Sequence, residues 1–250
     1  MNVLALDTTV RAGSVALVVG DRLVDERRGD ASRSHAERLP SDLLDVAAAH
    51  GVAMEDVDVF AVAAGPGSFT GLRIGIASVQ GLAFVGGTPV VAVSALEALA
   101  QLASIECDAG QIVAAWIDAQ RRDVYAAMYR VADAAIFAPE RLTSLAVPVV
   151  GDPAEILEAW TRRGDVPAVC IGDGAVRFAD VVTRLSPATR IGGAPLLAGA
   201  IGRMAAVRAQ RGEVVHPAAI QPLYVRRPDA EVDRERRVIT TTDTTRRPPA

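Results

Sequence analysis

Residues 65–75 read Gly-Pro-Gly-Ser-Phe-Thr-Gly-Leu-Arg-Ile-Gly, and the sequence stays largely apolar from there to Val85. The two glycines that flank the proline permit a tight turn that larger side chains would forbid, and Ser68 or Thr70 can cap the first free amides of a helix. The stretch therefore predicts a glycine turn that leads into an apolar helix over 71–85. The polar residues of this helix are Arg73, Ser78 and Gln80.

The predicted helix has two apolar faces. At 100° per residue, one face is formed by Gly71, Ile74, Gly75, Ser78, Leu82 and Val85. The other is formed by Leu72, Ile76, Val79 and Ala83. Such a helix needs two apolar neighbours, of which one can be the sheet of its own domain. The small residues of the first face allow a second helix to approach closely, and this second helix can come from another chain.

A glycine turn before a helix is also compatible with an anion site. A Walker loop places a lysine on the phosphates, but this sequence contains no lysine. The nearest cation, Arg73, lies in the first turn of the helix, where its charge opposes the helix dipole. We therefore expect an acidic partner or a ligand at Arg73, and a structural turn and an anion site both remain open.

Composition indicates a soluble intracellular protein. Half of the 250 residues are hydrophobic, Cys107 and Cys170 are far apart in sequence, and the N-terminus has no basic leader. We expect a cytoplasmic chain without a membrane segment. The net charge of -4 argues against a surface devoted to nucleic acid. Arginine pairs at 121–122, 162–163 and 226–227 leave room for an RNA contact shared with partners.

The order of elements in the first half indicates an α/β fold. Strands are expected at 3–7, 14–19, 23–28, 59–63 and 88–93, and helices after Ser34-x-x-Glu37, over 71–85 and over 94–105. This β-β-β-α-β-α-β-α order is the actin-like, ribonuclease-H-like (ASKHA) pattern. We expect residues 1–108 to form a first unit with a mixed five-stranded sheet.

A second unit of the same kind is expected over 109–228. It begins with a strand over 112–118 that ends in Asp118, as the first strand ends in Asp7, so an internal duplication is indicated. A returning strand follows over 124–130, and later elements are a strand over 168–171 and helices over 153–163, 176–185 and 196–211. Fewer strands are expected here, which makes this unit abridged. Residues 229–250 are charged and threonine-rich and are expected to be disordered.

The candidate catalytic residues form no complete set. Asp7 can be a catalytic acid or can cap local amides, and in this fold class Asp7 and Asp118 could face a nucleotide across the cleft between the units. His35, beside Glu37, can be a base or a capping residue. Asp118 with Arg121 is typical of a turn-stabilising pair. The remaining histidines, His50 and His216, are isolated and give no metal-ligand spacing.

The glycine motif at 65–75 resembles the signature of the TsaB family. Four further pieces resemble the family: Leu6-Asp7-Thr8-Thr9, residues 34–39 (Ser-His-Ala-Glu-Arg-Leu), Asp118 with Val124-Tyr125, and the segment 222–227. The resemblance implies a non-catalytic dimerization subunit of the machinery that makes threonylcarbamoyladenosine in tRNA. In the paralogous catalytic subunit TsaD, two histidines hold a metal on the helix after the equivalent strand. Ala95 and Leu99 stand at those places here, so no metal and no cofactor are expected.

The resemblance also implies partners. TsaB pairs with TsaD through two helices of each N-terminal domain, and with the ATPase TsaE the complex modifies the adenosine 3′ of the anticodon. The chain would contact tRNA only through the complex and would form a homodimer when alone. The expected interface residues are Leu39, Leu43, Val46, Gly71, Arg73, Ile74, Gly75, Ser78 and Leu82. Two alternatives are an independent ATPase or phosphotransferase that uses Asp7 and Asp118, and a peptidase.

Overall fold

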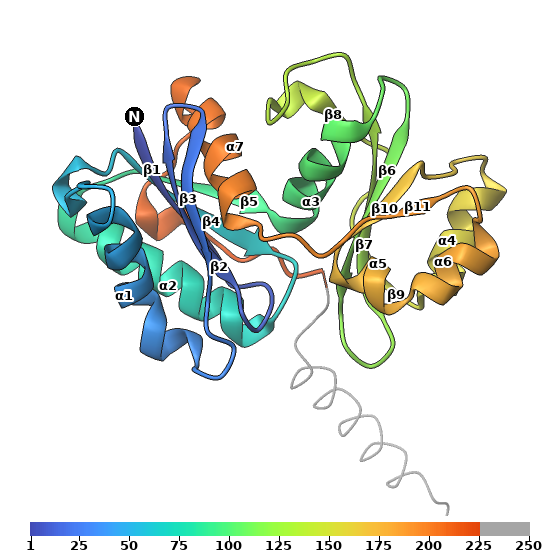
Figure 1. Cartoon of the computed structure of the whole chain (residues 1–250), viewed down its shortest axis with the longest axis horizontal. Coiled ribbons are helices and arrows are strands. Elements are labelled where there is room, and N and C mark those ends of the chain that lie inside the picture. Colours follow the sequence, from blue (N-terminus) through green and yellow to red (C-terminus); the bar gives the residue numbers. More distant parts are fainter. Residues whose placement is uncertain (226–250) are drawn as a thin grey trace, which may run out of the picture.

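The computed structural model describes residues 1–225, which form two β-sheets, each flanked by helices (Figure 1). The first sheet contains β1 (Asn2–Asp7), β2 (Ser14–Val19), β3 (Arg22–Arg28), β4 (Val59–Gly65) and β5 (Val90–Ser94). The helices connected to it are α1 (His35–Ala48), α2 (Phe69–Gly86) and α3 (Ala95–Ala103), with short 3-10 turns at Met54–Asp56 and Ser104–Glu106. This element order confirms the ribonuclease-H-like pattern predicted for the first half of the chain.

The first sheet has the strand order β3-β2-β1-β4-β5. β2 pairs antiparallel with both β1 and β3, which forms the predicted meander. β4 pairs parallel with β1, and β5 pairs parallel with β4. The sheet is therefore mixed and five-stranded, as predicted. Because β4 and β5 run parallel, each must be reached by a crossover helix, and α1 and α2 provide these crossovers.

Both faces of the first sheet are covered. In β1, Leu4 and Leu6 belong to the apolar core with α1 and α2, whereas Val3 and Ala5 belong to the core with α3 and α7 (Ala198–Gln210). All four side chains are fully buried. The strand therefore reads as a continuous apolar run because water reaches neither face.

The last helix, α7, returns to the first sheet and packs across β1, β2 and β4 (Figure 1). The approach is close: a Cβ on Gly202 would lie 2.8 Å from Val18 Cγ2 and 3.1 Å from Ala5 Cβ. The first turn is fixed by the Gly199 N–H, which donates to Glu26 Oε1 at 2.7 Å. The sequence places this helix in the second unit, over 109–228, but the structure packs it with the first.

The second sheet contains β6 (Ile112–Asp118), β7 (Val124–Val131), β8 (Leu142–Ser144), β9 (Val149–Gly151), β10 (Val169–Ile171) and β11 (Arg190–Ile191). Its order is β11-β10-β6-β7-β8, with β9 also paired to β7. The expectation of fewer strands in the second unit is therefore wrong for the described residues. This unit has more strands than the first, but four of them have three residues or fewer.

The helices of the second unit are α4 (Pro153–Arg162), α5 (Asp173–Arg177) and α6 (Ala179–Leu185), with a 3-10 turn at Pro139–Arg141. A further 3-10 turn at Pro217–Ala219 packs against α2 of the first unit. The single helix predicted over 176–185 is divided at Phe178, which has the non-helical dihedrals φ -110° and ψ 34°. α3 lies between the two sheets and contacts both β5 and β6 (Figure 1). Its apolar residues join the two units in one core.

α2 is long and apolar enough to cross a membrane by length and composition. Its Leu72, Ile76, Val79 and Ala83 face, however, is buried against this chain's own sheet and α1, so the helix is part of the fold. The tail predicted over 229–250 lies outside the described residues.

Candidate functional site

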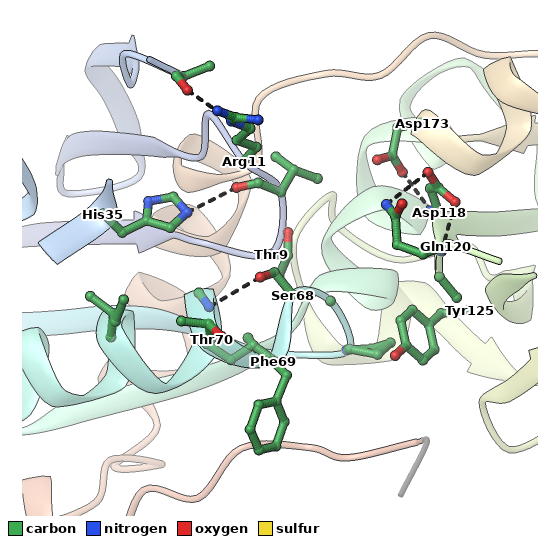
Figure 2. Close-up of a pocket in the computed structure, with 18 of the residues that line it drawn as sticks. Thr9, Arg11, His35, Ser68, Phe69, Thr70, Asp118, Gln120, Tyr125 and Asp173 are labelled. Atoms are coloured by element: carbon green, nitrogen blue, oxygen red, sulfur yellow. Dashed lines mark hydrogen bonds between the residues drawn. The ribbon is translucent and has the colours of Figure 1, made fainter. Parts of the chain in front are cut away.

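A cleft of about 1240 Å³ opens between the two units of the described chain (Figure 2). One wall is formed by the turn after β1, the start of α1 and the start of α2. The other wall is formed by the turn after β6, by Tyr125 and by Asp173, and residues 223–225 border the opening. Figure 2 shows Thr9, Arg11, His35, Ser68, Phe69 and Thr70 on one side, and Asp118, Gln120, Tyr125 and Asp173 on the other.

The glycine turn at the start of α2 has the geometry that its sequence predicts. Gly65 has φ +110°, a conformation that side chains disfavour. Ser68 is the N-cap, because its hydroxyl oxygen accepts from the Gly71 N–H at 3.2 Å. The Ser68 N–H donates to the Thr9 carbonyl at 2.8 Å. The Ser68 and Gly71 amides are thus satisfied within the chain, which favours the structural turn over the anion site.

Gly71 and Gly75 of α2 face the interior of this chain. A Cβ on Gly71 would collide with the Thr8 carbonyl oxygen, and a Cβ on Gly75 would collide with the Thr8 hydroxyl. Both glycines are buried. The close approach predicted for this face is therefore made to the turn after β1 of the same chain. The prediction that Gly71 and Gly75 contact a partner is corrected accordingly.

Apart from Arg73, which is exposed, the other predicted interface residues divide into two groups. Three of them, on α1, are fully buried in the chain's own core: Leu39, Leu43 and Val46. They cannot meet a partner, because α1 packs its apolar stripe against the sheet and α2. The remaining three on α2 are half-buried: Ile74, Ser78 and Leu82. The Ser78 hydroxyl donates to the Ile74 carbonyl at 2.8 Å, within the helix.

Arg73 is exposed on α2, but the partner that the structure gives it is aromatic rather than acidic. Its Nε donates to the Tyr224 hydroxyl at 3.0 Å, and its guanidinium lies 4.0 Å from the centroid of the Phe69 ring. The Phe69 and Tyr224 rings are 5.3 Å apart. A cation over an aromatic face is stabilised by the ring quadrupole. Among the described residues Arg73 has no acidic partner, and its contact with Tyr224 could not be predicted because Tyr224 lies 151 residues away in the sequence.

Asp7 is buried and caps the turn that follows β1. Its Oδ1 accepts from the Thr9 N–H at 2.9 Å and from the Thr9 hydroxyl at 2.7 Å. Burial raises the pKa of Asp7 above its ordinary value, against the two hydrogen bonds from Thr9, and the Asp173 carboxylate raises it further. Asp7 does not line the cleft, so it acts as a local capping group, the second of its two predicted roles.

We expect the Asp7→Asn variant to be more stable than the original chain at pH 7. Asparagine keeps an oxygen acceptor for Thr9 and removes a charge that is costly to bury. A carboxyl whose folded pKa is raised contributes stability that is present below its unfolded pKa and is lost as pH rises through its folded pKa. The advantage of Asp7→Asn should therefore shrink as pH falls from 7 toward 4 in urea unfolding experiments.

The matched control for this series is Glu37→Gln. Hydrogen bonds from Ser34 lower the pKa of Glu37, so this variant should be less stable than the original chain at pH 7. The stability that Glu37→Gln loses relative to the original chain should also become smaller as pH falls. The sign is opposite to that of Asp7→Asn, because Glu37→Gln is the less stable protein at pH 7. An Asp7→Asn variant that is less stable at pH 7 would mean that the fold needs the ionised carboxylate.

Asp118 anchors the turn between β6 and β7. Its Oδ1 accepts from the Gln120 N–H at 2.9 Å, its Oδ2 forms an ion pair with Arg177, and its N–H donates to Asp173 Oδ1 at 3.0 Å. The predicted turn-stabilising role fits this geometry, and Arg177 supplies an ion pair to Asp118. Burial raises the pKa of Asp173. Because only one of the two paired aspartates lines the cleft, the arrangement for Mg-ATP is incomplete.

His35 and Arg38 fix the wall of the cleft opposite Asp118. His35 Nε2 lies 3.2 Å from the Val10 carbonyl oxygen, and its Nδ1 lies 3.0 Å from Arg38 Nη2. This arrangement fits a neutral ring that donates through Nε2 and accepts at Nδ1. Partial burial lowers the pKa of His35, and the positive charge of Arg38 lowers it further. His35 therefore links the start of α1 to the turn after β1.

Arg38 is a residue that sequence reasoning missed. Its side chain is only 1% exposed, it pairs with Asp42 at 2.5 Å, and it also donates to the Ala12 carbonyl. Its guanidinium fills the place where a side chain at Gly29 would lie. A buried arginine was not suggested by the polar surroundings of residues 28–38, but the spacing of Arg38 and Asp42 was a usable signal.

The other titratable candidates are not gathered into a site. His50 pairs with Asp25 at 3.0 Å on the surface, and His216 accepts from the Ala218 N–H at 3.2 Å. Within residues 1–225, no group of three or more His, Cys, Asp or Glu side chains could hold a metal ion. Ala95 and Leu99, at the places where TsaD has metal ligands, are buried in the core.

Comparison with known proteins agrees with the fold and with the motifs. The family described as "TsaD: tRNA N6-adenosine threonylcarbamoyltransferase" matches residues 29–170. The Escherichia coli tRNA threonylcarbamoyladenosine biosynthesis protein TsaB is 33% identical over 188 residues, which are 70% of this chain and 80% of that protein. The Bacillus subtilis protein of the same name is 31% identical over 52% of this chain and 56% of its own length.

A solved structure from Pseudomonas aeruginosa, described as similar to peptidase YeaZ, superposes with a TM-score of 0.72 at 34% identity. It covers 90% of this chain and 99% of its own. Component A of the Acidaminococcus fermentans (R)-2-hydroxyglutaryl-CoA dehydratase superposes with a TM-score of 0.51 at 13% identity, covering 84% of this chain and 99% of its own, and shows the actin-like fold alone. Together with the glycine motif, these relatives show that the chain belongs to the TsaB family, whose members act in the biosynthesis of threonylcarbamoyladenosine in tRNA.

Proposed function

We propose that this chain is a non-catalytic subunit that pairs with a TsaD-type catalytic subunit in the cytoplasm. With a TsaE-type ATPase, this pair would transfer a threonylcarbamoyl group to the tRNA adenosine 3′ of the anticodon. The chain would form a homodimer through the same surface when the partner is absent. The proposal builds on membership of the TsaB family and extends it to a specific partner.

The observation that carries the proposal is the outer face of α2. Four exposed residues follow one another at intervals of four: Arg73, Ala77, Gly81 and Val85. Val85 is 92% exposed and the adjacent Phe84 is 66% exposed. Among residues 1–225, outside its own turn of helix, no atom lies within 4 Å of a Cβ built on Gly81. Exposed apolar and small residues in a row let a partner helix pack closely, and such faces commonly mark protein interfaces.

This outer face overlaps only in part with the interface predicted from the sequence. Arg73 belongs to it, and the half-buried Ile74, Ser78 and Leu82 border it on the side of α1. The catalytic alternative has less support, because Asp7 is enclosed by its own turn and does not line the cleft. A nucleotide-dependent phosphotransferase needs its carboxylates where the metal and the phosphates can reach them.

We expect the Ala77→Arg variant to weaken binding to the TsaD-type protein of the same organism by about 30- to 100-fold, or 2 to 2.7 kcal/mol, because it would bury an unpaired charge in a helix contact. At concentrations where the isolated chain is monomeric, its melting temperature should not change, since position 77 is exposed. Titration calorimetry measures the affinity, and threonylcarbamoyladenosine in cellular tRNA measures the activity.

Ala159→Arg is the matched control. Ala159 is an exposed alanine on α4 of the second unit, so this variant introduces the same charge on a helix away from α2. It should bind the partner like the original chain. Full binding by Ala77→Arg, with normal tRNA modification, would contradict the proposed surface.

A further inference from the structure

The loop that follows β7, over residues 132–141 (the back loop), lies at the far end of the second sheet from the cleft. β6 and β7 are antiparallel, with Asp118 opposite Val124 beside the cleft and Ile112 opposite Arg130 at the other end. Because β7 has eight residues and a strand rises about 3.3 Å per residue, the back loop begins roughly 23 Å from the turn beside the cleft. Figure 1 shows the back loop on one side of α3 and the turn between β6 and β7 on the other.

Gln101 of α3 joins this helix to the back loop. Its side chain is fully buried. Its Oε1 accepts from the Phe137 N–H at 2.9 Å, and its Nε2 donates to the Ala138 carbonyl at 3.0 Å. A buried polar group that loses its partner costs the full desolvation of that group. Gln101 therefore fixes the middle of the back loop on α3.

Arg141 fixes the base of the back loop at the end of α3. Its Nη2 donates to the carbonyls of Ser104 and Cys107, at 2.6 and 3.2 Å. Its Nη1 donates to the carbonyls of Ala132 and Ala134, at 2.9 and 3.2 Å. One guanidinium thus holds both ends of the back loop together with the segment that follows α3. The back loop and α3 should therefore move as one body.

α7 contacts the back loop from the first unit, because this helix packs on β1, β2 and β4. The guanidinium carbon of Arg203 lies 4.1 Å from the centroid of the Phe137 ring. Arg203 Nε is buried and has no hydrogen-bond acceptor among the described residues. Near the end of α7, Arg211 pairs with both carboxylate oxygens of Glu140, with 3.0 Å between Nη2 and Oε2. A desolvated cation–π contact and an ion pair thus join the two units.

Phe137 has a backbone conformation that its contacts must maintain. Its φ is 67°, a left-handed value that is costly for a bulky side chain. Such strain persists only where the surrounding structure over-determines it. The ring is 4% exposed and lies in the apolar core that α3 and α7 share. Phe137 is therefore the residue through which the back loop meets both helices.

α3 lies where one unit would turn against the other. It contacts β4 and β5 of the first sheet, and β6 and β7 of the second. Proteins built from two units close around a ligand by a hinge rotation of this kind. Because the cleft and the back loop lie on opposite sides of α3, closing the cleft would move the back loop away from α7 (Figure 1). The contacts of Arg203 and Arg211 oppose that movement.

We propose that the back loop is a tether that holds the cleft open, with Phe137 and Glu140 as the residues that α7 retains. The tether fixes the angle between the two units on the side of α3 away from the cleft. It is a property of the isolated chain and does not depend on the proposed partnership. Without these contacts the units would also populate a closed cleft.

The test measures the distance across the cleft by double electron–electron resonance between spin labels at Thr70→Cys and Thr183→Cys. Thr70 is exposed on the first cleft wall, and Thr183 is exposed on α6, which packs against α5 behind the second wall. Closing the cleft therefore shortens this distance. Cys107 and Cys170 are buried, so the labels attach to the new cysteines. An excess of unlabelled chain removes distances between copies, and the original sequence should give one narrow distribution.

Arg203→Met combined with Arg211→Gln removes both contacts between α7 and the back loop and leaves the ring of Phe137 in the core. This variant should raise the ratio of closed to open chains by about 30- to 100-fold, so that a shorter distance becomes a measurable part of the distribution. Arg162→Met combined with Arg163→Gln is the matched control, because both arginines are exposed near the end of α4 within the second unit. It should leave the distance unchanged.

Gln101→Leu tests the tether from the side of α3. It leaves the Phe137 N–H and the Ala138 carbonyl without their partner, so the back loop should shift on α3 and the same shorter distance should appear. Thr189→Val is its control, because it removes a buried hydroxyl that donates to the Pro167 carbonyl within the second unit. Thr189→Val should lower the melting temperature without a change in distance.

Three results would overturn the tether. One is an unchanged distribution in both the arginine variant and Gln101→Leu, whatever their melting temperatures, since the contacts would then contribute packing alone. Another is a shorter distance already present in the original sequence. The third is an equal shift in the control variants. Small-angle X-ray scattering provides an independent readout, because a closed cleft lowers the radius of gyration.

Discussion

Replacing Gly71 by alanine is expected to lower the free energy of unfolding by about 3 kcal/mol. The added Cβ would collide with the Thr8 carbonyl oxygen and would lie 3.2 Å from the Ser68 hydroxyl that caps α2. Because a backbone atom cannot move aside as a flexible side chain can, α2 must shift away from the turn after β1. Urea unfolding followed by circular dichroism measures the change.

Gly81 is the matched control within the same helix. It is exposed, and a Cβ at this position would meet no atom of the chain within 4 Å. Gly81→Ala should therefore stabilise the protein by about 0.5 to 1 kcal/mol, the helix-propensity difference. If Gly71→Ala proved as stable as Gly81→Ala, the close contact between α2 and Thr8 would be refuted.

Replacing Arg38 by methionine is also expected to cost about 3 kcal/mol. The side chain is buried, and its loss leaves the Ala12 carbonyl and Asp42 without their charged donor. Removal of one partner of a buried pair typically costs 3 to 5 kcal/mol. The cost here should lie at the lower end, because the Asp42 side chain is 27% exposed and water can solvate it in part. Thermal and urea unfolding measure the loss.

Arg33→Met is the control for this variant, because Arg33 is exposed and should change stability by less than about 0.5 kcal/mol. Hydrogen exchange provides a second measurement. Hydrogen exchange of the amides in residues 10–13 should accelerate in Arg38→Met, since this turn is held by Arg38 and His35. Unchanged exchange with unchanged stability would mean that the network does not fix the cleft wall.

Most of the first unit could be predicted from local patterns. The strand predicted over 14–19 has the bounds of β2, because its apolar residues point to two buried faces and clear turn signals stand on both sides of it. The Ser68 cap and the Ser34–Glu37 capping box could also be predicted from the sequence, since capping depends on residues three positions apart. Such features are local, so the sequence carries them in a single window.

Non-local packing was not predictable in the same way. β8, β9 and β11 have three residues or fewer, too few for any periodicity to be detected. The return of α7 to the first sheet has no local signal, because an apolar helix can cover either sheet equally well. The division at Phe178 was also missed, since that residue is apolar and continues the helical pattern.

At the candidate site, the sequence identifies residues of interest but does not show toward which neighbour each side chain points. A helical wheel assigns Gly75 and Ala77 to faces of α2, but it does not show which face the sheet occupies. The order of neighbours in space decides that Gly75 meets Thr8 while Ala77 remains exposed. The left-handed conformation of the turn over 120–122 could not be predicted either. Glycine is the residue that indicates this conformation, and the turn has Gln-Arg-Arg instead.

The position of α7 has a consequence for how the protein is made. A ribosome releases β1 to β5 and α3 long before residues 198–210, so one face of the first sheet lacks its α7 cover while the second unit is still being synthesised. Val18 and Ala5 meet their neighbour Gly202 only after α7 has been synthesised. A fragment that stops before α7 would therefore expose apolar strands, and the first unit reaches its native packing only after α7 has emerged from the ribosome.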